Sequence, residues 1–315
     1  MSFPRRRESK LNILFKNVIL DWIPFFKGMT KHHMPNFISD FSKTRWMVSN
    51  PARVTRTGMD GKPFRCPFCP GNEEDTPPEV SRIGEGEKNK PGWQVRVFAN
   101  LFPITEIHEV VVHSPDHEKN IEDFTQEHIE DILKTYQNRF NGLKEKGKVF
   151  IFHNYALISG ASLAHPHSQI TVVPNDIPTV TLPIQPIVNI VEQVGEFISY
   201  CPEYSEWSYE VWIRMSDEGL GARRLGISFE NLNEKQIQDL ARILQSTILK
   251  LKKIHDKNPH YSKKPFGYNF YIQPYGNWFL RIIPRFMERA GFELSTGIMV
   301  NSIEAKRASE ELRKL

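Results

Sequence analysis

The sequence predicts an α+β fold that contains antiparallel sheets with packed helices and consists of two copies of one unit. Two long amphipathic segments each begin after a typical helix N-cap residue, Thr125 in one case and Asn233 in the other. Short stretches typical of strands flank both segments. The order strand, long helix, strand, loop, strand therefore occurs twice, at a separation of roughly 110 residues, which indicates an internal duplication.

The first unit is expected to contain four strands and one helix. Residues 93–98 alternate like a half-buried strand, and 109–113 and 149–152 are short apolar strands. A fourth strand, 169–173, directly follows a histidine-rich segment. The helix after Thr125 carries one apolar face at helical spacing, formed by Ile129, Ile132, Leu133, Tyr136, Phe140 and Leu143.

The second unit is expected to follow the same plan. Residues 223–229 are predicted to form a strand, and 268–272 and 278–283 two more. The helix after Asn233 has an apolar face formed by Ile237, Leu240, Ile243, Leu244, Ile248 and Leu251. A final charged helix, 303–315, directs Ala305, Ala308 and Leu312 inward.

We expect three parts along the chain: an N-terminal appendage (1–40), a catalytic half (41–186) and a C-terminal half (187–315). A proline-rich stretch, 176–186, connects the halves. Within the appendage, charged residues interrupt the apolar stretch 11–26 and no small-residue cleavage site follows, which argues against a signal peptide or a membrane span. Two interpretations stay open: an extension ahead of a true start at Met29 or Met34, or an amphipathic helix packed on the domain.

Composition sets broad limits on function. With 39% hydrophobic residues, 25% charged residues and a formal net charge of +4, the chain has ordinary globular composition. That charge is compatible with a phosphate-bearing substrate but does not by itself indicate nucleic acid. Only three cysteines are present, an odd number that argues against a disulfide framework, so we expect a cytoplasmic protein.

The segment from Gly160 to Gln169, Gly-Ala-Ser-Leu-Ala-His-Pro-His-Ser-Gln, has the features of a phosphoryl-transfer site. Small residues allow close approach of the backbone to a ligand, and exposed amides there bind phosphate oxygens. Because side chains alternate along a strand, His167 and Gln169 share one face. The His167 imidazole is placed to attack phosphorus, and Gln169 to stabilise the developing charge. A structural pair of histidines is the less favoured alternative.

Cys66-Pro-Phe-Cys69 is the second chemical motif, and its spacing is typical of metal ligands. A redox pair of the thioredoxin type would open a helix, which Pro70-Gly71 disfavours. We therefore favour a structural zinc site, with a C-x-x-C that binds no metal as the alternative. Two further ligands are needed, and the candidate histidines are His108, His113, His117 and His165.

From about Trp46 onward the chain resembles the galactose-1-phosphate uridylyltransferase family of the histidine triad superfamily, and it is also similar to plant-type ADP-glucose phosphorylase. The shared motifs are Cys66-Pro-Phe-Cys-Pro-Gly-Asn-Glu, Val95-Arg-Val-Phe-Ala-Asn100, Ser114-Pro-Asp-His117, Asn154, Gly160-Ala-Ser162, His165-Pro-His-Ser-Gln169 and Gly291-Phe-Glu-Leu-Ser-Thr-Gly297. The resemblance implies duplicated histidine-triad-like units and a nucleotidyl-histidine intermediate.

The resemblance also implies roles for individual residues. His167 matches the nucleophile and Gln169 the residue that holds the transferred phosphate. Positions near the nucleotide or its phosphates are matched by Asn100, Asn154 and Ser162, and a pair of basic substrate contacts by Arg53 and Arg56. The implied zinc ligands are Cys66, Cys69, His117 and His165, a closed set that would brace the loop of His167 and provide no open position for catalysis.

The chain departs from the family pattern in two places. A second-half histidine cluster that holds a second metal in some relatives is replaced by Asn277-Trp-Phe-Leu-Arg281, and Gln273 stands where a histidine is frequent, so we expect one structural zinc ion and no second metal. Leu101 replaces a residue that is often polar near the ribose, so nucleobase and sugar selectivity are open. The resemblance further implies a homodimer.

The combined prediction is a UDP-glucose:hexose-1-phosphate uridylyltransferase of galactose metabolism. One alternative keeps the site but uses inorganic phosphate as acceptor, as in a nucleotide-sugar phosphorylase. Hydrolysis is disfavoured because Gln169, a neutral amide, cannot shuttle protons to water. From another class, a zinc-stabilised nucleic-acid-binding protein is disfavoured because the basic residues are scattered.

Overall fold

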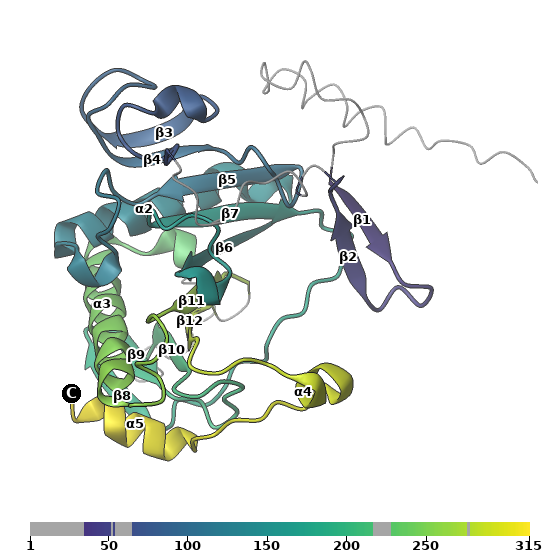
Figure 1. Ribbon diagram of the computed structural model, residues 1–315, viewed down its shortest axis with the longest axis vertical. Helices are drawn as coiled ribbons and strands as arrows, with labels where there is room; N and C mark the ends of the chain where they lie inside the picture. The colour runs from purple at the N-terminus through teal and green to yellow at the C-terminus, as the bar shows by residue number, and fades with distance from the viewer. Residues whose placement is uncertain (1–34, 52, 54–64, 217–227, 276–277) are drawn as a thin grey trace, which may run out of the picture. The chain divides into compact units, whose positions relative to one another are not determined.

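The computed structural model describes residues 35–51, 53, 65–216, 228–275 and 278–315 (Figure 1). The chain divides into two compact units, 1–54 and 55–315. The described part of the first unit is an antiparallel hairpin of β1 (Asn36–Ser39) and β2 (Trp46–Ser49). The apolar stretch 11–26 lies outside the described residues. No helix among the described residues is long and apolar enough to cross a membrane.

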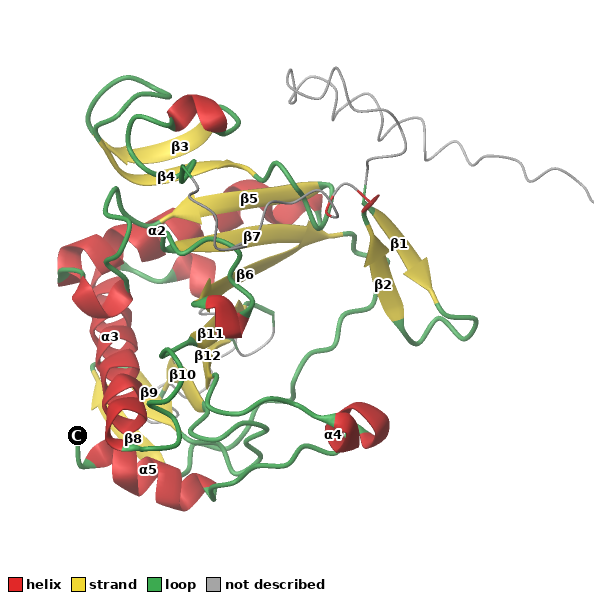
Figure 2. Ribbon diagram, in the orientation of Figure 1, coloured by secondary structure: helices red, strands yellow, loops and turns green. Residues whose placement is uncertain are grey.

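The second unit is organised around one antiparallel sheet of ten strands (Figure 2). The first repeat contains β3 (Glu79–Gly84), β4 (Trp93–Ala99), β5 (Ile107–Val112), α2 (Gln126–Leu143), β6 (Lys148–Tyr155) and β7 (His167–Val173). The second repeat contains β8 (Ile190–Val194), β9 (Phe197–Tyr200), β10 (Val211–Met215), α3 (Glu234–Lys257), β11 (Tyr268–Gln273) and β12 (Phe279–Pro284). Helices α4 (Gly291–Thr296) and α5 (Ala305–Arg313) follow the second repeat. The described residues also contain short 3-10 helices: η4 (Glu73–Asp75), η5 (Ile121–Asp123), η6 (Lys144–Lys146), η7 (Leu157–Ser159) and η9 (Phe229–Asn231).

The strand order confirms the predicted duplication. Counted outward from the central β6–β11 pair, the order is β6, β7, β5, β4, β3 on one side and β11, β12, β10, β9, β8 on the other. Each strand of the first repeat thus has a counterpart at the same distance from the centre and at the same place in chain order. The predicted α+β class with antiparallel strands is also confirmed, although the two repeats share a single continuous sheet.

The two long helices form where their caps predicted them. Thr125 accepts a hydrogen bond from the backbone N–H of His128, and Asn233 forms a reciprocal capping box with Gln236. The apolar faces of both helices pack against one face of the sheet and form the main hydrophobic core. In α5, the predicted inward residues Ala305, Ala308 and Leu312 are buried.

Sequence patterns missed both strands of the N-terminal hairpin, β1 and β2, and four strands of the ten-stranded sheet, β3, β8, β9 and β10. Most of the predicted strand 223–229 lies outside the described residues, and Phe229 belongs to η9 rather than to a strand. The strand that precedes α3 is instead β10, which is buried along most of its length. Because both of its faces are covered, β10 lacks the polar–apolar alternation that identifies a half-exposed strand.

Candidate active site and metal centre

The Cys66–Cys69 turn lies against the sheet face opposite to α2 and α3. The Cys69 N–H donates to the Cys66 carbonyl, and the Asn72 side chain donates to the same carbonyl at 2.8 Å. The Glu73 carboxylate accepts from the Gly71 N–H at 2.9 Å and from the Trp93 indole at 2.8 Å. These bonds attach the turn to β4 and fix the direction of both sulfur atoms.

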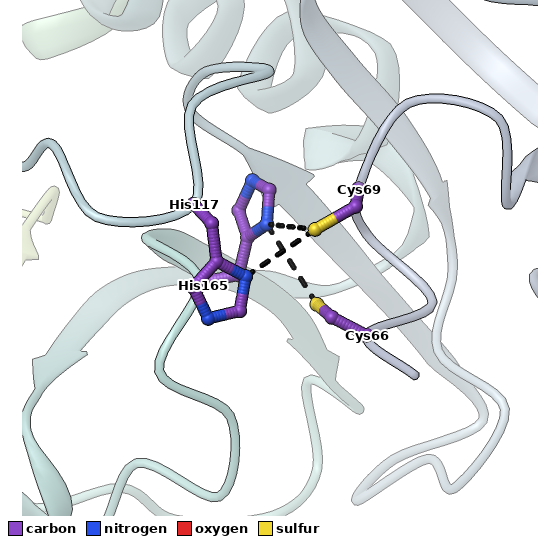
Figure 3. Close-up of side chains that lie close together, drawn as sticks. All are labelled: Cys66, Cys69, His117 and His165. Atoms are coloured by element: carbon purple, nitrogen blue, oxygen red, sulfur yellow. Dashed lines mark hydrogen bonds between the residues drawn. The ribbon is translucent and has the colours of Figure 1, made fainter. Parts of the chain in front are cut away.

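Four side chains converge on one point between this turn and the β7 entry (Figure 3). One ligand atom from each of Cys66, Cys69, His117 and His165 lies within 4.8 Å of the other three. Cys69 Sγ is 3.3 Å from His117 Nδ1 and 3.6 Å from His165 Nδ1, and Cys66 Sγ is 3.7 Å from His165 Nδ1. Tetrahedral zinc, with Zn–S about 2.3 Å and Zn–N about 2.0–2.1 Å, requires sulfur–nitrogen separations of about 3.6 Å. The geometry therefore fits a four-coordinate metal ion.

The protonation of His165 suits a metal ligand. Its Nε2–H donates to the Ser114 carbonyl at 2.7 Å, so the second ring nitrogen, Nδ1, carries the lone pair that faces the sulfur atoms. Burial lowers the pKa of His165 to about 4 and raises the pKa of the Cys66 thiol to about 11. Metal binding must therefore displace the Cys66 proton, whereas His165 is already neutral at physiological pH.

His167, the first residue of β7, is oriented by a backbone carbonyl next to the four candidate metal ligands. Its Nδ1–H donates to the carbonyl of His165 at 2.8 Å, which places the lone pair of the ring on Nε2. The Phe68 ring packs edge-on against the imidazole at a centroid distance of 5.2 Å. His165, a member of the candidate metal site, thus also supplies the carbonyl that orients the predicted nucleophile.

Gln169 lies on the same face of β7 and is held by His108. The Ile104 N–H donates to His108 Nδ1 at 2.9 Å, so the proton of this neutral ring is on Nε2. Nε2 is 3.0 Å from Gln169 Oε1, which accepts its hydrogen bond. Because Oε1 is engaged in this way, the Gln169 NH2 group is the end of the amide that remains to donate to a ligand.

The other predicted substrate residues fall into three groups. Asn100 follows β4 and lies next to His108, with 3.3 Å between Asn100 Nδ2 and His108 Nε2. Asn154 lies on β6, the sheet neighbour of β7, and Ser162 lies in the loop that leads to β7. Arg53 belongs to the first compact unit, whose placement relative to this site is undetermined, and Arg56 lies outside the described residues.

The reverse face of β7 holds a buried polar cluster beneath the site. Ser168 Oγ is 2.8 Å from His113 Nε2 and 2.5 Å from the Tyr136 hydroxyl, and His153 Nδ1–H donates to the His167 carbonyl at 2.9 Å. Burial holds the pKa of His113 well below its ordinary value, and burial together with the neighbouring His167 lowers the pKa of His153 to about 3. Both imidazoles are therefore neutral in the fold at physiological pH.

Comparison with known proteins agrees with the resemblance inferred from the motifs. Residues 103–173 match the family model described as galactose-1-phosphate uridyl transferase, N-terminal domain. The chain is 25% identical to ADP-glucose phosphorylase from Arabidopsis thaliana, with 90% of this chain and 94% of the relative covered. It is 23% identical to galactose-1-phosphate uridylyltransferase from Thermotoga maritima, with 85% and 95% covered. The chain is thus similar over most of its length to galactose-1-phosphate uridylyltransferases and to ADP-glucose phosphorylase.

Solved structures support the same fold. The crystal structure of the Arabidopsis thaliana ADP-glucose phosphorylase with bound ADP-glucose aligns with a TM-score of 0.66 at 24% identity, covering 89% of this chain and 99% of that chain. Likeness at this identity is evidence for the shared fold.

In the second repeat, the described part of the segment 277–281 is occupied by apolar and ion-paired side chains. Phe279, the first residue of β12, stacks on Trp212 at a centroid distance of 4.0 Å. Arg281, two residues further, forms an ion pair with Glu210 through a 2.6 Å contact, and both side chains are buried. Asn277 lies outside the described residues. Within the described part of the chain, one group of side chains is close enough to hold a metal ion, that of Cys66, Cys69, His117 and His165.

Sequence reasoning assigned no function to His108 beyond the metal. The structure places His108 beside Gln169 and His113 on the opposite face of the sheet. Neither belongs to the group of four candidate metal ligands. The alternation of β5 contained this information. His108, Val110 and Val112 lie on one face of β5, and the last two pair with Gln169 and His167, whereas His113 has the opposite parity.

Proposed function

We propose that this chain is a nucleotidyltransferase that transfers a nucleoside monophosphate between phosphorylated sugars through a covalent bond to His167. The observation that carries this proposal is the hydrogen bond from His167 Nδ1–H to the His165 carbonyl, because it commits Nε2 to be the nucleophile. Gln169 supports the assignment, since its amide donor lies on the same strand face.

The proposed reaction is a double displacement at phosphorus. The lone pair of His167 Nε2 attacks the α-phosphorus of a nucleotide-sugar, a P–N bond forms, and the bond to the leaving hexose 1-phosphate breaks. A phosphate oxygen of the acceptor then attacks the same phosphorus, and the P–N bond breaks to restore the imidazole. The His165 carbonyl stabilises the positive charge on the ring in the intermediate, and the Gln169 NH2 group donates to a non-bridging oxygen.

In this proposal a zinc ion would be held by Cys66, Cys69, His117 and His165. When bound, it would supply structural bracing, because four protein ligands leave no position for a substrate. His165 would transmit this bracing to the site, since its Nδ1 faces Cys69 Sγ and its carbonyl orients His167.

The first candidate reaction uses UDP-glucose as donor and galactose 1-phosphate as acceptor. Arg53, Arg56, Asn100, Asn154 and Ser162 are proposed as substrate contacts, on the basis of the family motifs. The similarity to galactose-1-phosphate uridylyltransferases, including that of Thermotoga maritima, supports this assignment. We further propose a cytoplasmic homodimer, by analogy with the family.

The second candidate reaction is phosphorolysis of ADP-glucose, with inorganic phosphate as acceptor. It is favoured by the match to Arabidopsis thaliana ADP-glucose phosphorylase, which extends over 90% of this chain. Both candidates share the nucleotidyl-His167 intermediate and differ in the nucleobase and the acceptor.

Mass spectrometry of the intact protein after mixing with UDP-glucose or ADP-glucose tests the proposal. We expect a mass increment of one uridylyl or adenylyl group on the wild type and none on a His167→Asn variant. Adding galactose 1-phosphate or inorganic phosphate to the labelled protein then identifies the acceptor that removes the label. An unlabelled wild type with both nucleotide-sugars refutes the intermediate.

A further inference from the structure

Asn269 of the second repeat reaches into the first repeat at the centre of the sheet. It lies on β11 directly opposite Asn154 of β6, in the strand pair that joins the two repeats (Figure 1). Asn269 Nδ2 is 2.7 Å from Asn154 Oδ1 and 2.8 Å from the backbone carbonyl of Ser159. One side-chain amide thus bridges a strand and a turn of the other repeat.

The Ser159 carbonyl fixes the orientation of both amides. A carbonyl oxygen only accepts, so the Asn269 atom that faces it is the NH2 group. That same NH2 group faces Asn154, whose nearest atom must therefore be its oxygen. The two hydrogens of Asn269 Nδ2 are used by these two acceptors, and Asn154 is left with its own NH2 group directed away from the β6–β11 pair.

Asn154 and Ser159 lie on either side of the turn that precedes the His167 loop. The register of β6 and β7 pairs His153 with Ser168, so Asn154 continues toward the level of His167. The turn itself has unusual backbone conformations, with φ of +67° at Ala156 and +85° at Gly160. For a non-glycine residue such as Ala156 this conformation is costly and requires support from its surroundings. The bond from Asn269 to Ser159 provides such support next to Gly160-Ala161-Ser162.

We propose that Asn269 is a positioning residue for the nucleotide: it turns the Asn154 NH2 group toward an acceptor oxygen of the nucleotide and holds the Gly160–Ser162 turn in place. This inference rests on the proposed nucleotidyl transfer at His167. It gives the second repeat a contribution to the site of the first.

Asn269→Asp tests this inference because a carboxylate at neutral pH only accepts hydrogen bonds. It would face two oxygen atoms, so the Asn154 amide must rotate and the turn must detach. We expect faster hydrogen exchange of the backbone amides in residues 156–163, and a drop of about tenfold in the second-order rate constant for nucleotidylation, as for the loss of one hydrogen bond. Asn269→Ser, which keeps an uncharged donor, is expected to lie between this variant and the wild type.

Two comparisons separate positioning from general destabilisation. In an Asn154→Ala background, Asn269→Asp should slow nucleotidylation by less than it does in the wild type, because one of the two groups that Asn269 holds is already absent and only the turn is released. Asn141→Asp, on the exposed end of α2, introduces the same charge and should leave both readouts unchanged.

Each outcome of this experiment decides the inference. Unchanged exchange and an unchanged rate constant in Asn269→Asp overturn it, and so does a full further loss in the Asn154→Ala background. If the wild type takes up no nucleotide label, the proposed function fails, and the exchange measurement alone decides whether Asn269 holds the turn.

Discussion

Replacing His108 with phenylalanine is expected to slow nucleotidylation while preserving the fold. The His108 side chain is only 3% exposed, and phenylalanine keeps its approximate ring shape. The substitution removes the acceptor of the Ile104 N–H, at 2.9 Å, and the donor to Gln169 Oε1, at 3.0 Å. A buried N–H without a partner costs about 1–3 kcal/mol, so we expect a stability loss in that range.

The effect on rate follows from the freedom that Gln169 gains. If the Gln169 amide takes both orientations equally, half of the molecules keep the NH2 group toward the phosphate. The smallest expected slowing of nucleotidylation is therefore about twofold. Complete loss of a donor to the developing charge lowers the rate by about 10²–10³, which is the largest slowing expected. Because a neutral hydrogen bond contributes about 1 kcal/mol, which corresponds to about fivefold, we expect nucleotidylation to slow by about fivefold, between these two limits.

Rapid-quench mass spectrometry at saturating nucleotide-sugar measures this rate directly. The matched comparison is made in a Gln169→Ala background, where His108→Phe should have no further effect on nucleotidylation because its hydrogen-bond partner is absent. A rate equal to that of the wild type would refute the orienting role of His108. Equal slowing with and without Gln169 would assign the effect to destabilisation instead.

Three further predictions follow from the geometry of the site. His167→Asn keeps a donor for the His165 carbonyl, so intact-mass analysis should find no nucleotide label while thermal unfolding shifts by only a few degrees; any label places the nucleophile elsewhere. Cys69→Ser should lose the bound metal, measured by elemental analysis, and several kcal/mol in urea unfolding, and unchanged metal content would contradict the ligand set. Lowering the pH from 7 to 5 should reduce the stability of the metal-free protein by about 6 kcal/mol, because His113, His153 and His165 are neutral in the fold and each unfolded imidazole takes up a proton below about pH 6.5. His153→Phe should remove about a third of this pH dependence in urea titrations, and a variant with the full dependence would show that His153 does not cause it.

Local sequence signals predicted the long helices, but they did not predict which strands pair in the sheet. The caps Thr125 and Asn233 act within one helical turn, so the beginnings of α2 and α3 were predicted correctly from the sequence. In contrast, β9 has four residues, and β10 is covered on both faces. β9 is short and pairs with its chain neighbours β8 and β10, and β10 also pairs with the distant β12, so neither strand shows the alternation on which the predictions relied.

The metal site shows the same division between local and non-local information. Cys66-x-x-Cys69 is a local motif, and spacing alone identified it. The choice among four histidines depended on the family resemblance, because the ligands come together only when β5 pairs with β7. Alternation along β5 separates His108 from His113, but which face carries the metal is determined by the packing of the Cys66–Cys69 turn.

The described part of the second repeat has no counterpart of the histidine-rich site in the first, which raises the question of what the second repeat contributes. In β12, the strand that corresponds to β7 in the sheet order, the first residue is the buried Phe279, and the neighbouring Arg281–Glu210 pair is buried as well. Breaking such a pair costs about 3–5 kcal/mol, so these side chains maintain the repeat as a stable half of the sheet. The proposed site requires a stable partner for β6, because β6 carries Asn154, a proposed substrate contact, and pairs with β7 on one side and with β11 on the other. Without β11, β6 would become an exposed edge strand, and the backbone beside His167 would lose support on that side. The second repeat therefore contributes to the site through the β6–β11 pair, and this contribution does not require histidines of its own.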